Sequence, residues 1–454
     1  MSWSAQALTD LTSALVVGNS KVVGDVIEQA ISDNEERRGE QIKLHDRYEG
    51  DAPIFHRKLK NPDKVNNRLF NDFFGDVVDT KQGYMGNSPT VVLDSEEAAK
   101  IEFVQAYLKK NHAEYEMSEA VKDAAICGAS GKILYVDGES NVRERRVPGY
   151  EVIFIKDATT GRSVYAIRYY TITDEQGVKR YRVEFYDDAQ VWYFMQQDSG
   201  HYMPDTTRMD LAGNVVTHQL HLFDGVPVLD FRNNDERMGD CEKTLTLMDA
   251  YDRTESDANS EIEQLRLAYL YLKGAGMNVD EEWLKTIKQT GVIPLDQDGD
   301  VGFITKSLDD DIIEHHLDRL EQNIMRFAKS VDFNSDAFGG QMPIIAFQIK
   351  IAGLEHKSKI TERIFRAELM RQWEMMTGYW AKAQTITIDP TALSFYFTRE
   401  IPMNLSEEVT RIAQGRGHVS LETLYKITSF IDDPAAEAER LAAEESIIPG
   451  LDEE

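Results

Sequence analysis

The stretch "LDDDIIEHHLDRLEQNIMRFAKSV", residues Leu308–Val331, decides how the fold is interpreted. Its apolar residues alternate spacings of four and three positions: Ile313, Leu317, Leu320, Ile324, Phe327 and Val331. This pattern is typical of a long helix that buries one narrow apolar seam against a second helix. Acidic residues at its start, Asp309–Asp311, and the cations Arg326 and Lys329 near its end complement the helix dipole.

A second long helix is expected upstream, over residues 241–268. Asp240 can cap its start, and apolar residues follow at helical spacing: Leu245, Met248, Tyr251, Ala258, Ile262 and Leu265. Its middle, "DRTESDANSEIEQ", is very polar, so this helix offers only a narrow stripe to a partner. Between the two helices, residues 269–307 show the pattern of strand, helix, strand, turn and strand.

Downstream of the seam, Asn334–Lys350 reads "NSDAFGGQMPIIAFQIK". Its adjacent glycines do not form a phosphate-binding loop, because no Lys-Ser/Thr pair follows them. They indicate a flexible turn, and Pro343 suits the first turn of the helix that comes after it. We expect that helix to run to about Tyr379, with a kink where Gly353 interrupts it.

The rest of the chain separates helical patterns from strand patterns. Helical patterns occupy residues 20–44, 69–78, 95–110 and 115–127, and short aromatic and β-branched segments divided by turns occupy 132–232. Further on, the strand "LSFYFTREIP" precedes small helices, in which Asn404 and Glu407 have capping-box spacing and Pro434 opens the last helix. These blocks predict an α+β fold.

Composition limits the possible function classes. The 454 residues include 50 Lys and Arg against 79 Asp and Glu, a net charge of −29, so we expect no DNA binding along the general surface. No apolar run approaches the roughly 20 residues that span a bilayer, and no signal peptide is recognisable. Cys127 and Cys241, far apart in sequence, exclude a disulfide scaffold and favour a reducing cytosol.

Motifs for phosphate and calcium binding fail on their spacing. In "CGASGKILY", only two residues separate Gly128 from Gly131, where a phosphate loop has four, and no hydroxyl residue follows Lys132. The aspartates of "DQDGDVGF", Asp296–Asp300, have calcium-ligand spacing, but Ser307 stands where the twelfth-position glutamate belongs. A hairpin turn explains this segment better.

The histidines give no shared metal site. His218 and His221 are expected on opposite sides of a strand, and the neighbours His315 and His316 diverge on a helix. No Ser-His-Asp or Cys-His arrangement is recognisable, so we expect no catalytic centre, metal or cofactor. Two other classes remain open: a metal-dependent nuclease or phosphohydrolase that uses Asp309–Asp311 or Asp296–Asp300, and a coiled-coil structural adaptor without a channel.

The two long helices need partners, because each has one narrow apolar stripe and a solvated opposite face. Copies of the same chain in a ring are the simplest partners. The segment between the helices would then project from the end of a two-helix stem.

Three segments of the chain resemble the portal proteins of tailed bacteriophages, of the siphophage type. They are "NNRLFNDFFGDVVDTKQGYMGNSP" (66–89), "VPVLDFRNNDERMGDCEKTLTLMDAYDRTESDANSEIEQ" (226–264) and "SFYFTREIPMNLSEEV" (394–409). They resemble, in order, the family's Asn-Asn-Arg helix with its glycine-containing turn, the start of the first stem helix, and the strand and turn before the crown. The resemblance implies a structural protein rather than an enzyme.

The resemblance also implies the portal fold and its parts. These are a wing (1–240, helical then strand-rich), a first stem helix (241–268), a clip (269–307), a second stem helix (308–331), a tunnel loop (332–346), a long kinked helix with a return strand (347–402), and a crown with the C-terminal tail (403–454). It further implies a ring of twelve copies at one capsid vertex, assembled in the host cytoplasm. Double-stranded DNA would pass through it, driven by a separate terminase. Scaffolding, major capsid and head-completion proteins are the other implied partners, and no membrane is.

Several residues follow from this as candidate site residues. The tunnel-loop candidates are Asn334, Ser335, Phe338, Gly339, Gly340 and Gln341, with Phe338 and Met342 expected at the base of the loop. The candidate cations of the channel wall are Arg319, Arg326 and Lys329, which could equally pair with acids on a neighbouring helix. Lys285 and Lys288 are possible terminase contacts on the clip.

Overall fold

The computed structural model divides the chain into two compact units. Unit 1 comprises Met1–Glu49, Phe74–Glu242 and Ala328–Glu454, and unit 2 comprises Gly50–Phe73 and Lys243–Phe327. The structure describes all residues except 63, 86–88, 95–96, 174–176, 211, 266–268, 274–284, 286–288, 291–299, 305–309, 334–343, 400–404, 417, 427, 429–430, 432–433 and 448–454.

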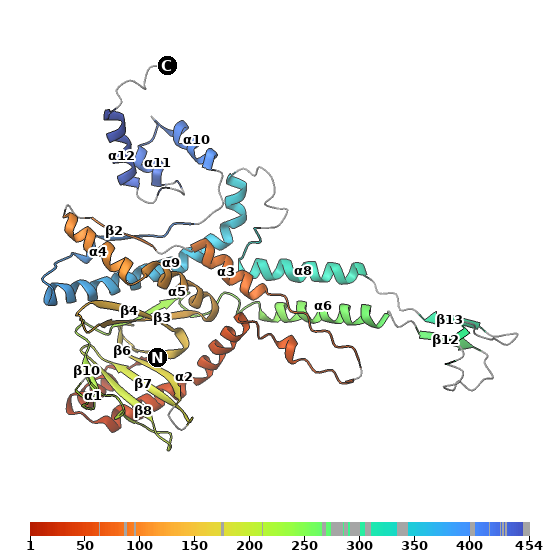
Figure 1. Cartoon of the computed structure of the whole chain (residues 1–454), viewed down its shortest axis with the longest axis horizontal. Helices are drawn as coiled ribbons and strands as arrows, with labels where there is room; N and C mark the ends of the chain where they lie inside the picture. Colours follow the sequence, from red (N-terminus) through yellow and green to blue (C-terminus); the bar gives the residue numbers. More distant parts are fainter. Residues whose placement is uncertain are drawn as a thin grey trace. The chain divides into compact units, whose positions relative to one another are not determined.

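Unit 1 contains a seven-stranded sheet in the order β1-β5-β6-β7-β8-β10, with β9 beside β8 (Figure 1). The strands are β1 (Ser2–Trp3), β5 (Val152–Asp157), β6 (Ser163–Thr173), β7 (Lys179–Tyr186), β8 (Gln190–Gln196), β9 (Tyr202–Pro204) and β10 (His218–Leu220). All neighbours are antiparallel except β1 and β5. Alternate residues of each strand point to opposite faces, so the two faces have separate cores.

Two N-terminal helices cover one face of this sheet. They are α1 (Ala5–Val17) and α2 (Ser20–Tyr48), and they bury apolar residues such as Leu11 and Ile27 against Ile155 and Ile167. The opposite face packs on a three-stranded sheet in the order β11 (Val228–Arg232), β3 (Ala129–Val136) and β4 (Val142–Pro148).

The largest core of unit 1 surrounds α9 (Ile344–Ala383). It also receives apolar side chains from α3 (Phe73–Met85), α4 (Ala98–Lys110), α5 (Ala113–Cys127), β2 (Thr90–Leu93) and β14 (Leu393–Tyr396). Trp380 of α9 packs edge-on against Tyr107, with ring centroids 5.2 Å apart. Figure 1 shows that α9 changes direction after its N-terminal part. A Cβ added at Gly353 of this helix would lie 3.7 Å from Cβ of Lys329, which is an ordinary contact.

Three short C-terminal helices also belong to unit 1: α10 (Leu405–Gly415), α11 (Leu421–Lys426) and α12 (Pro434–Ile447). The prediction that Pro434 opens the last helix is confirmed, whereas Asn404 of the expected capping box lies outside the described residues. None of the described helices combines the length and apolar content that a membrane span requires.

Unit 2 contains α6 (Leu245–Leu265), β12 (Tyr269–Lys273), β13 (Asp300–Ile304) and α8 (Asp310–Ala328, whose last residue belongs to unit 1). The strands β12 and β13 pair antiparallel across the segment that separates them in sequence. Unit 2 also includes residues 50–73, here named the strap, which contain the short 3₁₀ helix Pro53–His56.

Helices and strands are present together but largely in separate blocks, as the α+β prediction requires. One predicted helix was placed wrongly: Leu69 lies in the extended strap, and the helix begins at Phe73 and continues through Gly83. The charged strand β4, "VRERRVP", was missed, because as an edge strand it keeps several charged side chains partly accessible.

Candidate functional site

The two long helices of unit 2 lie beside each other. Burial, followed by the negative charges of Glu255, Glu321, Glu314 and Asp318, raises the pKa of Tyr251, so this α6 side chain lies close to the acidic residues of α8. In the α8 seam, Leu320 and Ile324 are buried as predicted. Phe327 was wrongly placed in the seam, since it is 56% exposed and Ala328 takes the buried position one turn after Ile324.

The polar middle of α6 binds the strap instead of facing solvent. The backbone N–H groups of Asn67, Leu69 and Asn71 donate to Ser260 Oγ (3.0 Å), Ser256 Oγ (2.9 Å) and Asp252 Oδ1 (2.9 Å) in that order. Every second residue of the strap therefore meets every fourth residue of α6, with the two segments antiparallel. The spacings match, because two extended residues span about 6.6 Å and four helical residues about 6 Å.

The strap explains why α6 has only a narrow apolar stripe. Asp252, Ser256 and Ser260 are 2%, 0% and 7% exposed, so they form a buried polar stripe one turn apart. Asn71 and Asn67 also donate from their side chains to Glu255 and Glu263. The two bonds to serine hydroxyls contribute about 1 kcal/mol each, and those to the carboxylates about 1.5–3 kcal/mol, so these polar contacts stabilise the strap on α6.

A buried ionic cluster in unit 1, here named the lysine joint, lies where several chain segments meet. Lys81 Nζ of α3 donates to Thr361 Oγ1 of α9 (2.9 Å) and to Asn233 Oδ1 (2.5 Å), and it lies 3.4 Å from Asp240 Oδ2. Lys357 Nζ of α9 lies 3.1 Å from the same carboxylate oxygen. Lys357 Nζ also donates to the carbonyl of the last residue of α8 at 2.6 Å.

The prediction that Asp240 caps the following helix was wrong. The helix α6 begins at Leu245, and the carbonyl of Thr244 accepts its first backbone bonds. Burial opposes ionisation of Asp240, but the charges of Lys81 and Lys357 outweigh it and lower the pKa of the carboxyl. A carboxylate between two ammonium groups and an amide is stabilised more than a solvent-facing cap would be.

Burial is the main influence on Lys81, which is 0% exposed. It lowers the pKa of the ammonium group to about 8, although Asp240 acts in the opposite direction and Lys357 adds to the decrease. The joint thus contains two cations and one anion, and it fixes α3, α9 and the end of α8 around one carboxylate.

The predicted tunnel-loop residues, Asn334, Ser335, Phe338, Gly339, Gly340 and Gln341, all lie outside the described residues, as does Met342. On either side of that segment, Phe333 and Phe347 stack with ring centroids 6.4 Å apart. Both are partly buried against the core around α9. The two ends of the segment are therefore held together by aromatic residues that the sequence pattern did not single out.

The predicted cationic residues have different surroundings. Arg319 and Arg326 are exposed on α8, and Lys329 follows its end in a left-handed conformation with φ of 54°. Lys285 is exposed, whereas Lys288 lies outside the described residues.

The glycine motif around Lys132 has a packing role. Lys132 is buried on β3 and pairs with Glu144 at 3.1 Å. Gly128 ends α5 with φ of 88°, and a Cβ there would lie 1.9 Å from the carbonyl oxygen of Arg237. A Cβ at Gly131 would lie within 3 Å of Val147. Close packing of the backbone explains these glycines without a phosphate.

The histidines have separate surroundings as well. His218 stacks on Trp192, with ring centroids 4.8 Å apart, and His221 is buried and contacts the carbonyl of Asp187. Within the described part of the chain, no group of three or more His, Cys, Asp or Glu side chains is placed to hold a metal ion. Of the three aspartates at calcium-ligand spacing, only Asp300 belongs to the described residues, as the first residue of β13.

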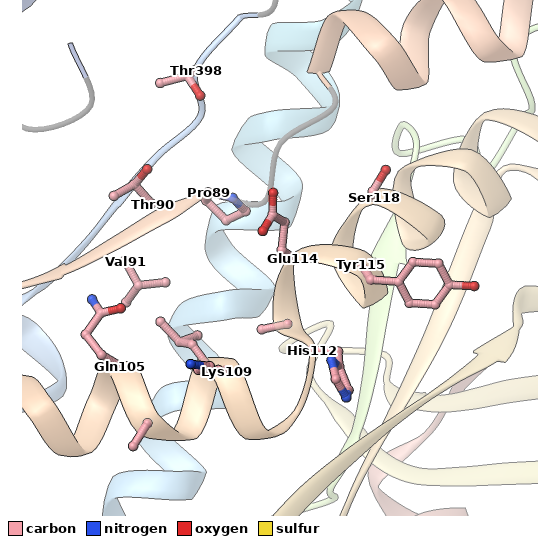
Figure 2. Close-up of a pocket in the computed structure, with 13 residues that line it drawn as sticks. Pro89, Thr90, Val91, Gln105, Lys109, His112, Glu114, Tyr115, Ser118 and Thr398 are labelled. Carbon is pink, nitrogen blue, oxygen red and sulfur yellow. The ribbon is translucent and has the colours of Figure 1, made fainter. Parts of the chain in front are cut away.

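A pocket with a volume of about 980 Å³ lies beside the turn between α4 and α5. Figure 2 shows that His112, Glu114 and Tyr115 point in different directions around it. The other labelled side chains include Gln105, Lys109 and several hydroxyl residues. This lining has no paired acid and base and no activated nucleophile of the kind that catalysis needs.

Comparisons with known proteins identify the family of this chain. Residues 27–448 match the family described as phage portal protein, SPP1 Gp6-like. The portal protein of Bacillus phage SPP1 is 26% identical over 400 residues, which cover 86% of this chain and 78% of that protein. The portal protein of Clostridium phage phiCD119 is 23% identical over 406 residues, which cover 86% of each. Since the family match spans most of the sequence, this chain belongs to the SPP1 Gp6-like family of phage portal proteins, a structural family of virion components.

Proposed function

We propose that this chain forms a closed ring of twelve copies at one vertex of a phage capsid. Double-stranded DNA passes through the axial channel, driven inward by a separate terminase and outward at ejection. The ring also serves as a platform for procapsid assembly and for joining the head to the tail. The match of residues 27–448 to the portal family is the single observation that carries this proposal.

Features of unit 2 support the assignment of the stem. The helices α6 and α8 are long and adjacent. The strap covers the polar side of α6, whereas α8 has only a narrow apolar seam and an exposed outer side, which further copies would cover. In this proposal residues 241–268 and 308–331 are the stem helices, and residues 269–307, with the β12–β13 pair, are the clip. The net charge of −29 suits a conduit, because a strongly cationic wall would bind phosphate and slow the DNA.

Unit 1, together with the strap of unit 2, would then supply the remaining parts. Residues 1–240 form the wing, 332–346 the tunnel loop, 347–402 the long helix and return strand, and 403–454 the crown. The Phe333–Phe347 stack supports a loop whose two ends are fixed while its middle, including Gly339 and Gly340, faces the lumen. In this proposal the lysine joint fixes the N-terminal half of α9 to the wing through Asp240, and so positions the base of the loop.

The proposed partners follow from these parts. The terminase large subunit would contact the clip, where Lys285 is exposed, and scaffolding, major capsid and head-completion proteins would contact other surfaces of the ring. No described feature favours a nuclease or a channel-free adaptor over this function.

Native mass spectrometry of the purified chain tests the proposal. We expect a closed oligomer, with twelve copies as the main species, that persists on dilution. A chain that stays monomeric across protein concentration, salt and added scaffolding protein would refute it. Wing-only fragments are not a suitable substitute, because both units contribute to the ring.

A further inference from the structure

The outer surface of α8 is divided by charge. On one side of its seam, Glu314, Asp318 and Glu321 follow each other at spacings of four and three residues. On the other side lie Arg319 and Arg326, seven residues apart. Because successive residues are rotated by about 100° around a helix, these two sets lie about 120° apart on the two sides of the seam, and they are here named the acidic flank and the basic flank.

Both flanks are accessible in the isolated chain. All five side chains of the two flanks are exposed. Within the part of the chain that the structure describes, neither Arg319 nor Arg326 has an ion-pair partner. Beside the basic flank, Phe327 is 56% exposed, so this flank combines two cations with an aromatic surface. Such a combination of arginine and aromatic residues is enriched in protein interfaces.

We propose that the basic flank of α8 docks on the acidic flank of α8 in the next copy around the ring. This inference rests on the proposed ring and adds its stem contact. In a cyclic ring every copy presents one surface to the neighbour ahead and a different surface to the neighbour behind, so the contact is heterologous. A helix with opposite charges on its two flanks fits that requirement, whereas a two-fold dimer would place like flanks together.

The spacing of the charges supports this pairing. The arginines 319 and 326 are seven residues apart, and so are the glutamates 314 and 321. A single offset of five residues, about 7.5 Å along the helix, therefore aligns both pairs at once. A modest tilt of the helices against the ring axis supplies such an offset, and Asp318 lies between the two glutamates.

A second copy fits the basic flank better than DNA does. From Asp310 to Ala328 the helix carries five acidic residues against two arginines, so a phosphate that approached it would meet a net negative field. An acidic protein surface with matched spacing satisfies both arginines and the neighbour's glutamates together. Lone arginines on an acidic helix would gain little from counterion release.

Charge reversal of each flank tests the proposal in the full-length chain. The first variant is Arg319→Glu with Arg326→Glu, and the second is Glu314→Arg with Glu321→Arg. Each alone should raise the protein concentration for half-assembly at least about tenfold, or about 1.4 kcal/mol, measured by mass photometry. The control Lys109→Glu with Lys110→Glu, on exposed residues of α4, makes the same charge change as the first variant and should assemble like the wild type.

Mixing the two variants gives the decisive result. One variant then has two acidic flanks and the other two mainly basic flanks, so equal amounts should form rings that contain both in equal numbers by native mass spectrometry. Rescue on mixing also shows that both variants are folded. A chain with all four substitutions should assemble like the wild type.

Other results would overturn the inference. If the wild type forms rings and the first variant forms them equally well, the flanks do not dock, although the proposed ring stands. If the first variant keeps its rings but loses affinity for a short DNA duplex, the arginines face DNA instead. If the wild type forms no ring at all, the proposed function fails, and this contact fails with it.

Discussion

The substitution Asp240→Asn should destabilise unit 1 by about 3 kcal/mol. Asparagine keeps the shape of the side chain but removes the carboxylate that pairs with both Lys81 and Lys357. Leaving a buried cation without its partner costs about 3–5 kcal/mol. The side chain of Lys357 is 16% exposed and can turn toward water, which favours the lower end of that range. The double variant Asp240→Asn with Lys81→Met should recover most of the stability lost in Asp240→Asn, since apolar replacements in buried ion pairs are often neutral.

The pH dependence of the free energy of unfolding gives a second test of the lysine joint. Burial lowers the pKa of Lys81 to about 8 in the folded chain, against an ordinary value of 10.5. Between these values the unfolded chain binds a proton that the folded chain does not, so the free energy of unfolding increases as the pH rises. Lys81→Met lacks this contribution. The difference in stability between the wild type and this variant should therefore grow by about 2 kcal/mol, in favour of the wild type, from pH 7 to pH 10.

Urea unfolding of subunits kept monomeric, followed by tryptophan fluorescence, measures both effects. The buried Trp373 and Trp380 report directly on the core around α9. Lys382→Met is a matched control, because Lys382 pairs with Asp224 at a site where both are 63% exposed. An Asp240→Asn variant within about 0.5 kcal/mol of the wild type would show that the ion pairs of the lysine joint do not stabilise the fold. A stability difference between Lys81→Met and the wild type that does not change with pH would show that Lys81 has an ordinary pKa.

Three further predictions concern the strap, the packing of glycines and the tunnel loop. Ser256→Ala should cost about 1 kcal/mol and speed hydrogen exchange of the strap amide bound to it, whereas Thr246→Ala, exposed on the same helix, should change neither. Gly128→Ala should lower stability in urea by at least about 3 kcal/mol, because its φ is 88° and a carbonyl blocks the Cβ, while Gly138→Ala, with open space, should stay within about 0.5 kcal/mol. Valine at both positions of Gly339–Gly340 should impair DNA packaging and leave rings intact, and normal packaging would contradict the loop assignment.

The arrangement of the long elements could be predicted from periodicity. The spacing of apolar residues in Leu308–Val331 reflects which side chains are buried, so it predicted the position of α8 well. The aromatic and β-branched segments from residue 132 onward likewise predicted β3 and β5–β8. Helix ends were less predictable. Phe327 fits the seam by spacing, but α8 ends one residue later and the phenyl side chain of Phe327 stays exposed.

Contacts between distant segments could not be predicted in the same way. Asp240 is followed by an apolar helical pattern, which suggests a cap, and only the folded chain brings Lys81 and Lys357 to it. A signal was nevertheless present, because Lys81 lies on the buried stripe of α3 with Val77 and Val78. The polar stripe of α6 at every fourth residue was also visible, but a strap from residues 50–73 was needed to explain it.

Copies of this chain are proposed to surround a channel, and an end-on cryo-electron microscopy average of the purified full-length protein would reveal that channel. We expect a closed ring with twelve-fold symmetry and a continuous axial opening wide enough for a DNA duplex. A ring with a closed centre, an open filament or a dispersed monomer at assembly concentrations would contradict it.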